Sequence, residues 1–450
     1  MPTSIERWYF FFALVAFNAM PFLVGNQPLE LNSLQAAGVL SVEGDSTNQI
    51  IFALLYALGG VLMLAHIRLR TLVHLGWPLA LLITLCLLSA LSTDAPALVV
   101  RRCGALLGTV LLGLYSGLRF DFSQMLRLMS RVAAMVLVAS LLVAALLPSL
   151  GLDAEGRLRG VYTHKNEMGG AAALFFLIVV ARLMEARYRF DLPKNSLRLL
   201  AVACAAALIL SHSATPAPTL VIALVAMLAM RFSSSLDGAR LAMIASVMIA
   251  LVVFAAIILP QLELAEMTSV LGRDSTLSGR TTIWAFVSEM IAERPWLGYG
   301  YGGAFWMGPN GGSEQLFART NLATPHAHNG FLELTLGVGI FGPVLLAAAI
   351  VLLLRRAIRL RKTSPLPLTP CWDWVVGFVT FYAVLNLSEN EAWGGNHLMT
   401  EFLVYVVVRT NVLASTMRAS IQAAKPTLPP RGTLLTARLP GQPLRSNTSG

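Results

Sequence analysis

Two histidines and an asparagine stand close together in TPHAHNGFLELTLGVG, residues 324–339. Imidazole has an unperturbed pKa near neutral pH, so His326 and His328 are candidates for proton transfer, with His328 favoured. Residues two apart share a face only in an extended segment, and no second pair at metal-ligand spacing accompanies them, so metal binding is disfavoured. The alternative is a hydrogen-bonded boundary histidine. Asn329 and Glu333 are positioned to orient a ring or an incoming hydroxyl group.

Cationic side chains gather in other connections of the chain. Six residues form the set: Arg157, Arg159, His164, Lys165, Arg273 and Arg280. A guanidinium group donates two hydrogen bonds in one plane, which suits phosphate oxygens. The set is therefore a candidate anion-binding site. The alternative is that these arginines pair with Asp153, Glu155 and Asp274 or reach the phosphates of membrane lipids.

The elements that must position these residues are membrane helices. Of the 450 residues, 56% are hydrophobic and only 12% are charged. The chain has more apolar surface than the core of a soluble protein can bury. We expect an all-α polytopic protein with about twelve transmembrane helices, since about 20 apolar residues cross a bilayer. The predicted spans are 8–25, 49–66, 72–91, 97–117, 129–149, 167–183, 199–212, 217–231, 241–260, 330–354, 372–388 and 397–412.

The basic residues predict the orientation, because short loops rich in Lys and Arg stay in the cytoplasm. They cluster in alternate connections, near residues 68–70, 119–131, 182–198, 231–240 and 355–362. Both termini are therefore predicted to be cytoplasmic, with Arg101 and Arg102 as exceptions on the outer side. The net charge of +10 is explained by this cytoplasmic bias and by a role in attracting the anionic headgroups of the lipid bilayer. It therefore requires no nucleic-acid partner. The four cysteines lack metal or redox spacing and are predicted to be packing residues.

Two segments depart from the pattern of spans. The connection 262–329 is a long outer loop, and loops of that length are uncommon unless functional. A helix is predicted within it from Ser278 to just before Pro295, either lying along the lipid headgroups or packed on the bundle as a lid. GYGYGG at 298–303 predicts tight turns and not a nucleotide site, because no strand precedes it. The predicted domains are a transmembrane domain, 1–412, and a disordered cytoplasmic tail, 413–450.

Four segments of the chain resemble a known family. RLRGVYTHKNEMGG, LGRDSTLSGRTTIW, ERPWLGYGYGGAFW and HAHNGFLELTLGVGIFG, in this order, are similar to segments of the O-antigen polymerase and ligase superfamily of bacterial envelopes. Their amino-acid sequences are most similar to the ExoQ-like exopolysaccharide polymerase branch of this superfamily. The resemblance covers about residues 150–400 and implies a GT-C-type glycosyltransferase that uses no metal and no cofactor.

The resemblance also implies substrates and residue roles. The donor would be a glycan on undecaprenyl diphosphate, used at the periplasmic face of the bacterial inner membrane, with a chain-length regulator as a possible partner. Arg159 and Arg280 match the arginines that hold the diphosphate, and His328 matches the histidine of the transfer. The remaining substrate-binding candidates are Arg157, His164, Lys165, Asn166, Arg273, His326, Asn329 and Glu389, the last being an acidic position at an outer helix end.

Three activities are compatible with such a chain. A polymerase joins repeat units to one another, whereas an O-antigen ligase transfers the glycan to lipid A core or, in a relative, to protein. A transporter or flippase for the same lipid-linked sugars would need repeats and charges near the membrane midplane. The sequence shows neither of these features, and its polar residues gather at the outer rim, so it favours the enzyme.

Overall fold

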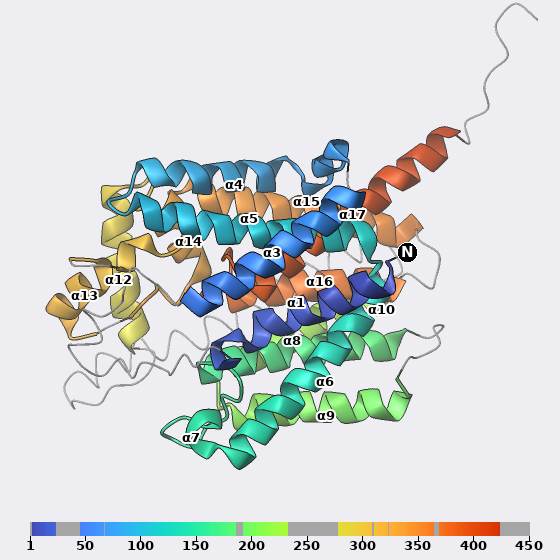
Figure 1. Ribbon diagram of the computed structural model, residues 1–450, viewed down its shortest axis with the longest axis horizontal. Coiled ribbons are helices and arrows are strands. Elements are labelled where there is room, and N and C mark those ends of the chain that lie inside the picture. Colours follow the sequence, from blue (N-terminus) through green and yellow to red (C-terminus); the bar gives the residue numbers. More distant parts are fainter. Residues whose placement is uncertain are drawn as a thin grey trace, which may run out of the picture. The chain divides into compact units, whose positions relative to one another are not determined.

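The computed structural model describes residues 2–23, 46–66, 68–185, 192–232, 278–307, 310–322, 324–363 and 369–423. Within these ranges every regular element is a helix, and the extended pairing is limited to an isolated bridge between Leu152 and Leu158. The predicted all-α class is confirmed. The helices run roughly alongside one another in a bundle (Figure 1).

Among the described residues, six helices are long and apolar enough to cross a membrane. They are α3 (Ser46–His66), α5 (Pro96–Arg119), α6 (Phe122–Leu146), α8 (Lys165–Met184), α15 (Phe341–Thr363) and α17 (Leu398–Ala423). Further helices coincide with predicted spans: α1 (Ser4–Leu23), α4 (Trp77–Leu88), α9 (Lys194–Leu210), α10 (Pro216–Phe232) and α16 (Thr369–Leu385). The predicted span 241–260 lies outside the described residues. The protein is a multi-pass membrane protein.

Close helix packing in this bundle depends on small residues. On α5, a Cβ placed at Gly113 would come within 2.7 Å of the Glu401 carbonyl oxygen, and one at Gly117 within 2.8 Å of the Val408 side chain. Without a Cβ, α5 lies directly on α17, as small residues one turn apart permit in membrane helices. Also as predicted, the four cysteines are free and buried: Cys86, Cys103, Cys204 and Cys371.

The predicted span 330–354 is wrong as a single helix. It consists of α14 (Gly330–Val338) and α15, which begins at Phe341. Gly339 separates them with a φ of 77°, and a Cβ there would collide with the Trp296 carbonyl group. The Ile340 N–H donates to the Pro295 carbonyl oxygen at 2.9 Å. The break therefore fixes the outer loop against the bundle, which an uninterrupted apolar stretch does not reveal.

The helix predicted in the outer loop is present as α12 (Ser278–Glu293). Its apolar face, including Ile283, Val287 and Met290, is buried in a cluster formed with the short helices η3 (Ala304–Trp306), α13 (Gly312–Thr320) and α14. Helix α12 is thus packed against neighbouring helices, as in the packed arrangement. Helix α13 was not predicted from the sequence.

GYGYGG forms turns, as predicted. Glycines 298, 300, 302 and 303 have positive φ angles of 64°, 108°, 79° and 75°. The Tyr299 and Gly300 N–H groups donate to the Leu336 and Gly337 carbonyl oxygens. These turns fasten the outer loop to the carboxyl end of α14.

The chain divides into two compact units, Met1–Val412 and Leu413–Gly450. In the first unit, α12 and α13 lie at the end of the bundle opposite the start of α1 (Figure 1). In the second, residues 413–423 continue α17, so the prediction of disorder from residue 413 is wrong for this stretch. Residues 424–450 lie outside the described residues.

Candidate active site

A buried ion pair lies where several distant segments meet. Arg280, on α12, places its Nη2 atom 3.0 Å from Oε1 of Glu389, in the connection between α16 and α17. The same oxygen accepts a hydrogen bond from Asn166 Nδ2, on α8, at 3.2 Å. Asn166 in turn accepts from Ser213 Oγ at 2.9 Å. Of the predicted residues, the structure thus brings together Arg280, Asn166 and Glu389.

Both partners of this pair are largely shielded from solvent. The side chains of Arg280 and Glu389 are 13% and 11% exposed. Burial raises the pKa of the Glu389 carboxyl, and the charge of Arg280 opposes that effect. A guanidinium group has five N–H donors, so the bond to Glu389 leaves Arg280 donors to offer a second anion. The geometry fits a cation held in place by a carboxylate.

The two histidines lie beside this pair. The His326 and His328 rings are 4.2 Å apart, edge to face, and His328 has a φ of 49°. Burial, with smaller contributions from the charges of Arg280 and His164, lowers the pKa of His326 to about 4. The pKa of His328 is lowered to about 2, first by burial and then by the charges of His326, Arg280 and His164. Both imidazoles are therefore neutral at neutral pH. His326 Nδ1 accepts the His328 backbone N–H at 3.2 Å, whereas His328 Nδ1 has no hydrogen-bond partner among the described residues.

The turn that carries the histidines is rigidly held. The Ala327 N–H donates to Glu333 Oε2 at 2.8 Å, and the Ala327 carbonyl oxygen accepts from Trp284 Nε1 at 2.9 Å. Trp306 Nε1 donates to the same Glu333 carboxylate. Glu333 therefore fixes the backbone between the two rings; no hydrogen bond in the described region joins it to either imidazole. Such supporting contacts hold reactive groups in place.

Asn329 has a structural position. Its side-chain oxygen accepts from two backbone N–H groups of the first turn of α14 and so caps that helix. Its Nδ2 donates to the Leu387 carbonyl oxygen at 3.0 Å. The Gly330 N–H is 2.9 Å from the carbonyl oxygens of both Asn386 and Glu389. Asn329 thus joins the histidine turn to the connection that holds Glu389, and the expected contact to a ring is absent from the described bonds.

The outer connection before α8 differs from expectation. Arg159 is 8% exposed and donates to the carbonyl oxygens of Ser149 and Leu150, at 2.9 and 3.0 Å. Neither the hydrogen bonds nor the ion pairs of the described residues link it to Arg280 or His328. The reason is local: the short helix α7 (Pro148–Gly151) presents unpaired carbonyl groups to it. The structure does not bring Arg159 into the ion-pair site.

The other cations of this connection have different surroundings. Arg157 pairs with Asp153 at 2.6 Å and also contacts Glu155, which is the alternative that the sequence left open. His164 is the N-cap of α8, and its Nδ1 accepts from the Asn166 N–H at 3.3 Å. Burial, with the nearby charges of Lys165 and Arg157, lowers the pKa of His164. Arg273 lies outside the described residues.

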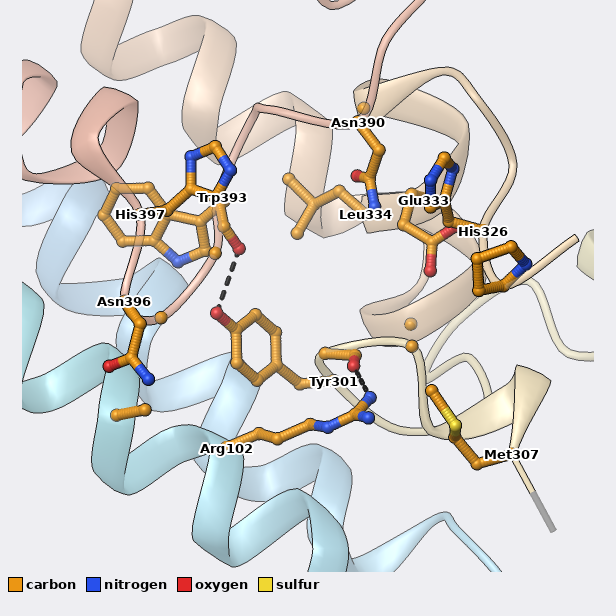
Figure 2. A pocket seen from close by; sticks show the side chains of 18 residues that line it. Arg102, Tyr301, Met307, His326, Glu333, Leu334, Asn390, Trp393, Asn396 and His397 are labelled. Atoms are coloured by element: carbon orange, nitrogen blue, oxygen red, sulfur yellow. Dashed lines mark hydrogen bonds between the residues drawn. The ribbon is translucent and has the colours of Figure 1, made fainter. Parts of the chain in front are cut away.

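A cavity of about 380 Å³ opens next to His326 (Figure 2). Tyr301 Oη donates to the Trp393 carbonyl oxygen at 2.9 Å, and Arg102 donates to the Gly302 carbonyl oxygen. Figure 2 shows the lining residues in three groups around the open centre: His326, Glu333 and Asn390; Trp393, Asn396 and His397; and Arg102 with Tyr301.

Sequence reasoning missed most of this cavity. Arg102 stood out only as an exception to the charge pattern. The polar stretch ENEAWGGNH, 389–397, between two apolar spans was the available signal for the rest. Within it, His397 Nε2 lies 3.0 Å from Glu391 Oε2. Burial, and the neighbouring charge of Glu389, raise the pKa of Glu391 to about 8.

The fold and the site define a multi-pass membrane protein with a polar, cation-containing site built by loops at one end of the bundle. The family described as O-Antigen ligase matches residues 199–347, which include Arg280, His326 and His328. The chain is also 29% identical, over 283 residues, to the exopolysaccharide production protein ExoQ of Rhizobium meliloti (strain 1021). That match covers 61% of this chain and 63% of ExoQ, so the chain spans less than two thirds of the relative's length.

Both comparisons thus find similarity to the O-antigen ligase and polymerase superfamily, and one of them to an ExoQ protein. The resemblance predicted from four segments is thereby confirmed. Three of those segments lie within the matched residues 199–347.

Proposed function

We propose that the protein is a membrane glycosyltransferase that polymerises undecaprenyl-diphosphate-linked repeat units into exopolysaccharide or O-antigen at the periplasmic face of the inner membrane. The observation that carries the proposal is the meeting of Arg280, Glu389 and the two histidines beside a polar cavity. The similarity to ExoQ, named as an exopolysaccharide production protein, supports a role in exopolysaccharide synthesis.

Arg280 is proposed to hold the diphosphate of the donor. When the bond between the anomeric carbon and the phosphate oxygen breaks, the diphosphate leaves with additional negative charge. A guanidinium already fixed by Glu389, at 3.0 Å, stabilises that charge without having to reorganise. Asn166, bonded to the same carboxylate, helps to hold the pair.

His328 is proposed to accept the proton of the acceptor. The acceptor hydroxyl oxygen forms a bond to the anomeric carbon, and its proton moves to the neutral imidazole. A bound diphosphate would neutralise the nearby charge of Arg280, which is one cause of the low pKa of His328. The donor therefore raises the basicity of His328 when it binds. His326, in contact with His328, faces the cavity.

The cavity beside His326 is proposed to receive the acceptor sugar. Its lining contains the aromatic rings of Tyr301 and Trp393 and the amides of Asn390 and Asn396. Apolar ring faces together with a few polar groups are typical of sites that orient a small polar ligand. Arg159 is proposed to act on the site only through the backbone that it holds.

The experiment is transfer by the full-length protein in vesicles, supplied with undecaprenyl-diphosphate-linked repeat units. Arg280→Ala should lower polymer formation by at least about 100-fold, which is typical for loss of one oxyanion-stabilising donor. Arg319→Ala is the matched control, since Arg319 forms an exposed pair with Glu289 on the outer loop, away from the cavity. Equal activity of Arg280→Ala and the control would exclude the diphosphate role.

A ligase is the second candidate, because the matched family carries that description. A polymerase lengthens the glycan with its own lipid-linked substrate alone, whereas a ligase requires lipid A core or a protein acceptor. Product that forms only after such an acceptor is added would establish the ligase.

A further inference from the structure

A second cavity, of about 200 Å³, lies beside the proposed acceptor cavity. Asn396 and His397, which line the acceptor cavity in Figure 2, line this second cavity as well, so the two spaces are adjacent. At about 30 Å³ per water molecule, the second cavity holds about seven waters, a space comparable to one sugar ring. The proposed transfer step assigns no role to it.

Segments that are far apart in the chain build the second cavity. Its lining comes from the later turns of α1, the first turns of α3 and α8, and the connection from α16 to α17. The same connection carries Glu389, the partner of Arg280. The second cavity thus shares a structural support with the proposed active site.

The lining of the second cavity combines aromatic rings with groups that form hydrogen bonds. Phe17, Phe52 and Tyr162 supply the rings, and Glu167 and Glu391 supply carboxyl groups. None of its described lining residues is a lysine or an arginine, so the cavity is poorly suited to a phosphate group. Apolar rings with a few polar groups are typical of sites that orient a small polar ligand, and a sugar presents both C–H faces and hydroxyl groups.

The carboxyl groups keep capacity for further hydrogen bonds. The two oxygens of Glu167 accept from Thr163 Oγ1 at 3.0 and 2.9 Å, whereas a carboxylate offers about four acceptor positions. Glu391 Oε2 lies 3.0 Å from His397 Nε2, and these two side chains are 21% and 33% exposed. Because burial raises the pKa of Glu391 to about 8, its carboxyl group carries a proton at neutral pH and can both donate and accept. Such groups match the hydroxyl groups of a sugar.

A glycine on α8 leaves the second cavity open. Gly170 lines the cavity and is buried, yet a Cβ placed there would have no heavy atom of the described residues within 4 Å. Protein interiors are normally close-packed, so open space beside a buried helix position is unusual. The neighbouring Gly169 differs, because a Cβ there would lie 2.8 Å from the Ser213 side chain. Helix packing thus explains Gly169, whereas Gly170 borders space that a ligand could occupy.

We propose that the second cavity is a subsite for a further sugar of the acceptor glycan, next to the sugar that reacts. This inference rests on the proposed glycosyltransferase function. The reacting sugar occupies the first cavity, and the next sugar lies beyond Asn396 and His397, against Phe52 and Gly170. The protein therefore recognises two consecutive sugars of its acceptor.

The experiment compares acceptors of one and two sugars. The full-length protein in vesicles receives its lipid-linked donor and size-separated fragments from partial hydrolysis of the polysaccharide that the cells make. For the wild type, the second sugar should raise kcat/KM for the acceptor by about tenfold or more, as one or two added hydrogen bonds would. Gly170→Leu, which fills the second cavity, should bring the ratio of the two kcat/KM values close to one. Because the readout is a ratio within one variant, a general loss of folded protein does not alter it.

Gly104→Leu is the matched control. Gly104 also lies within a helix, α5, a Cβ placed there meets no heavy atom of the described residues within 4 Å, and it lines neither cavity. This variant should keep the ratio of the wild type. Gly170→Ala, with its smaller side chain, should keep more of the ratio than Gly170→Leu. A wild-type ratio close to one, an unchanged ratio in Gly170→Leu, or an equal loss in Gly104→Leu would overturn the inference.

A binding measurement separates this inference from the proposed function. Thermal unfolding of the full-length protein in neutral detergent is recorded with each fragment and without donor. The two-sugar fragment should raise the unfolding temperature more than the one-sugar fragment in the wild type and in Gly104→Leu, but not in Gly170→Leu. A wild type that transfers no sugar to either fragment would refute the proposed function, and the unfolding temperatures would still decide the inference. Equal shifts by the two fragments in the wild type would contradict the second subsite.

Discussion

Replacing Glu389 with glutamine removes a charge and preserves the shape of the side chain. Glu389 Oε1 accepts from Arg280 at 3.0 Å and from Asn166 at 3.2 Å, and the two members of the ion pair are 13% and 11% exposed. Hydrogen bonds to charged groups contribute about 1.5–3 kcal/mol, so the free energy of unfolding should fall by about that amount. Arg280 would then lack its anchor, and a displacement of about 1 Å costs about 100-fold in rate.

The assay combines thermal unfolding with polymer formation in vesicles at saturating donor. Glu289→Gln is the control, because its pair with Arg319 is 52% and 65% exposed and contributes little. Glu389→Gln should lower both stability and rate, whereas Glu289→Gln should leave both nearly unchanged. A rate equal to wild type, together with the loss of stability, would refute the idea that Glu389 positions Arg280 for transfer.

Four further predictions concern other features. His328→Ala should lower the transfer rate by roughly 10²–10⁴, and full turnover at neutral pH would exclude its role as proton acceptor. Because the folded protein lowers the pKa of His326 from 6.5 to about 4, the unfolded state binds more protons in that window. The unfolding temperature should therefore drop as the pH falls from about 6.5 to about 4, and a slope unaltered in His326→Gln would contradict this. Gly117→Leu overpacks α5 against Val408 and should lower the free energy of unfolding by about 1–3 kcal/mol. Gly104→Ala should leave that free energy nearly unchanged, because no atom lies within 4 Å of a Cβ placed at Gly104. A chelator should leave transfer intact; activity lost to it and restored by a divalent cation would overturn the proposed metal-independent reaction.

The sequence predicts the helices well because apolar length is a local property. It also predicts α12, since Ser278 begins that helix and Pro295 follows its end. Hydropathy cannot reveal the break at Gly339, where the surrounding residues remain apolar. The break depends on the close contact between Gly339 and the Trp296 carbonyl group. Trp296 lies outside the apolar span, so no pattern within the span indicates this contact.

The candidate site was predicted in part. Residue types and the four similar segments identified Arg280, His328 and Glu389, whose surroundings the structure supplies. The position of Arg159 was not predictable, because its partners are backbone carbonyl groups of Ser149 and Leu150, and every residue has a carbonyl group. The sequence likewise did not identify Arg102 as a site residue, because its hydrogen bond to the Gly302 carbonyl oxygen depends on how the glycine turns fold.

The most direct measurement of the central claim is a structure of the full-length protein with a non-transferable undecaprenyl-diphosphate glycan bound. A diphosphate oxygen should lie about 2.7–2.9 Å from the Arg280 guanidinium, with Glu389 still on its opposite side and His328 against His326, which lines the acceptor cavity. A diphosphate bound elsewhere, with Arg280 contacting only Glu389, would contradict the proposed enzyme.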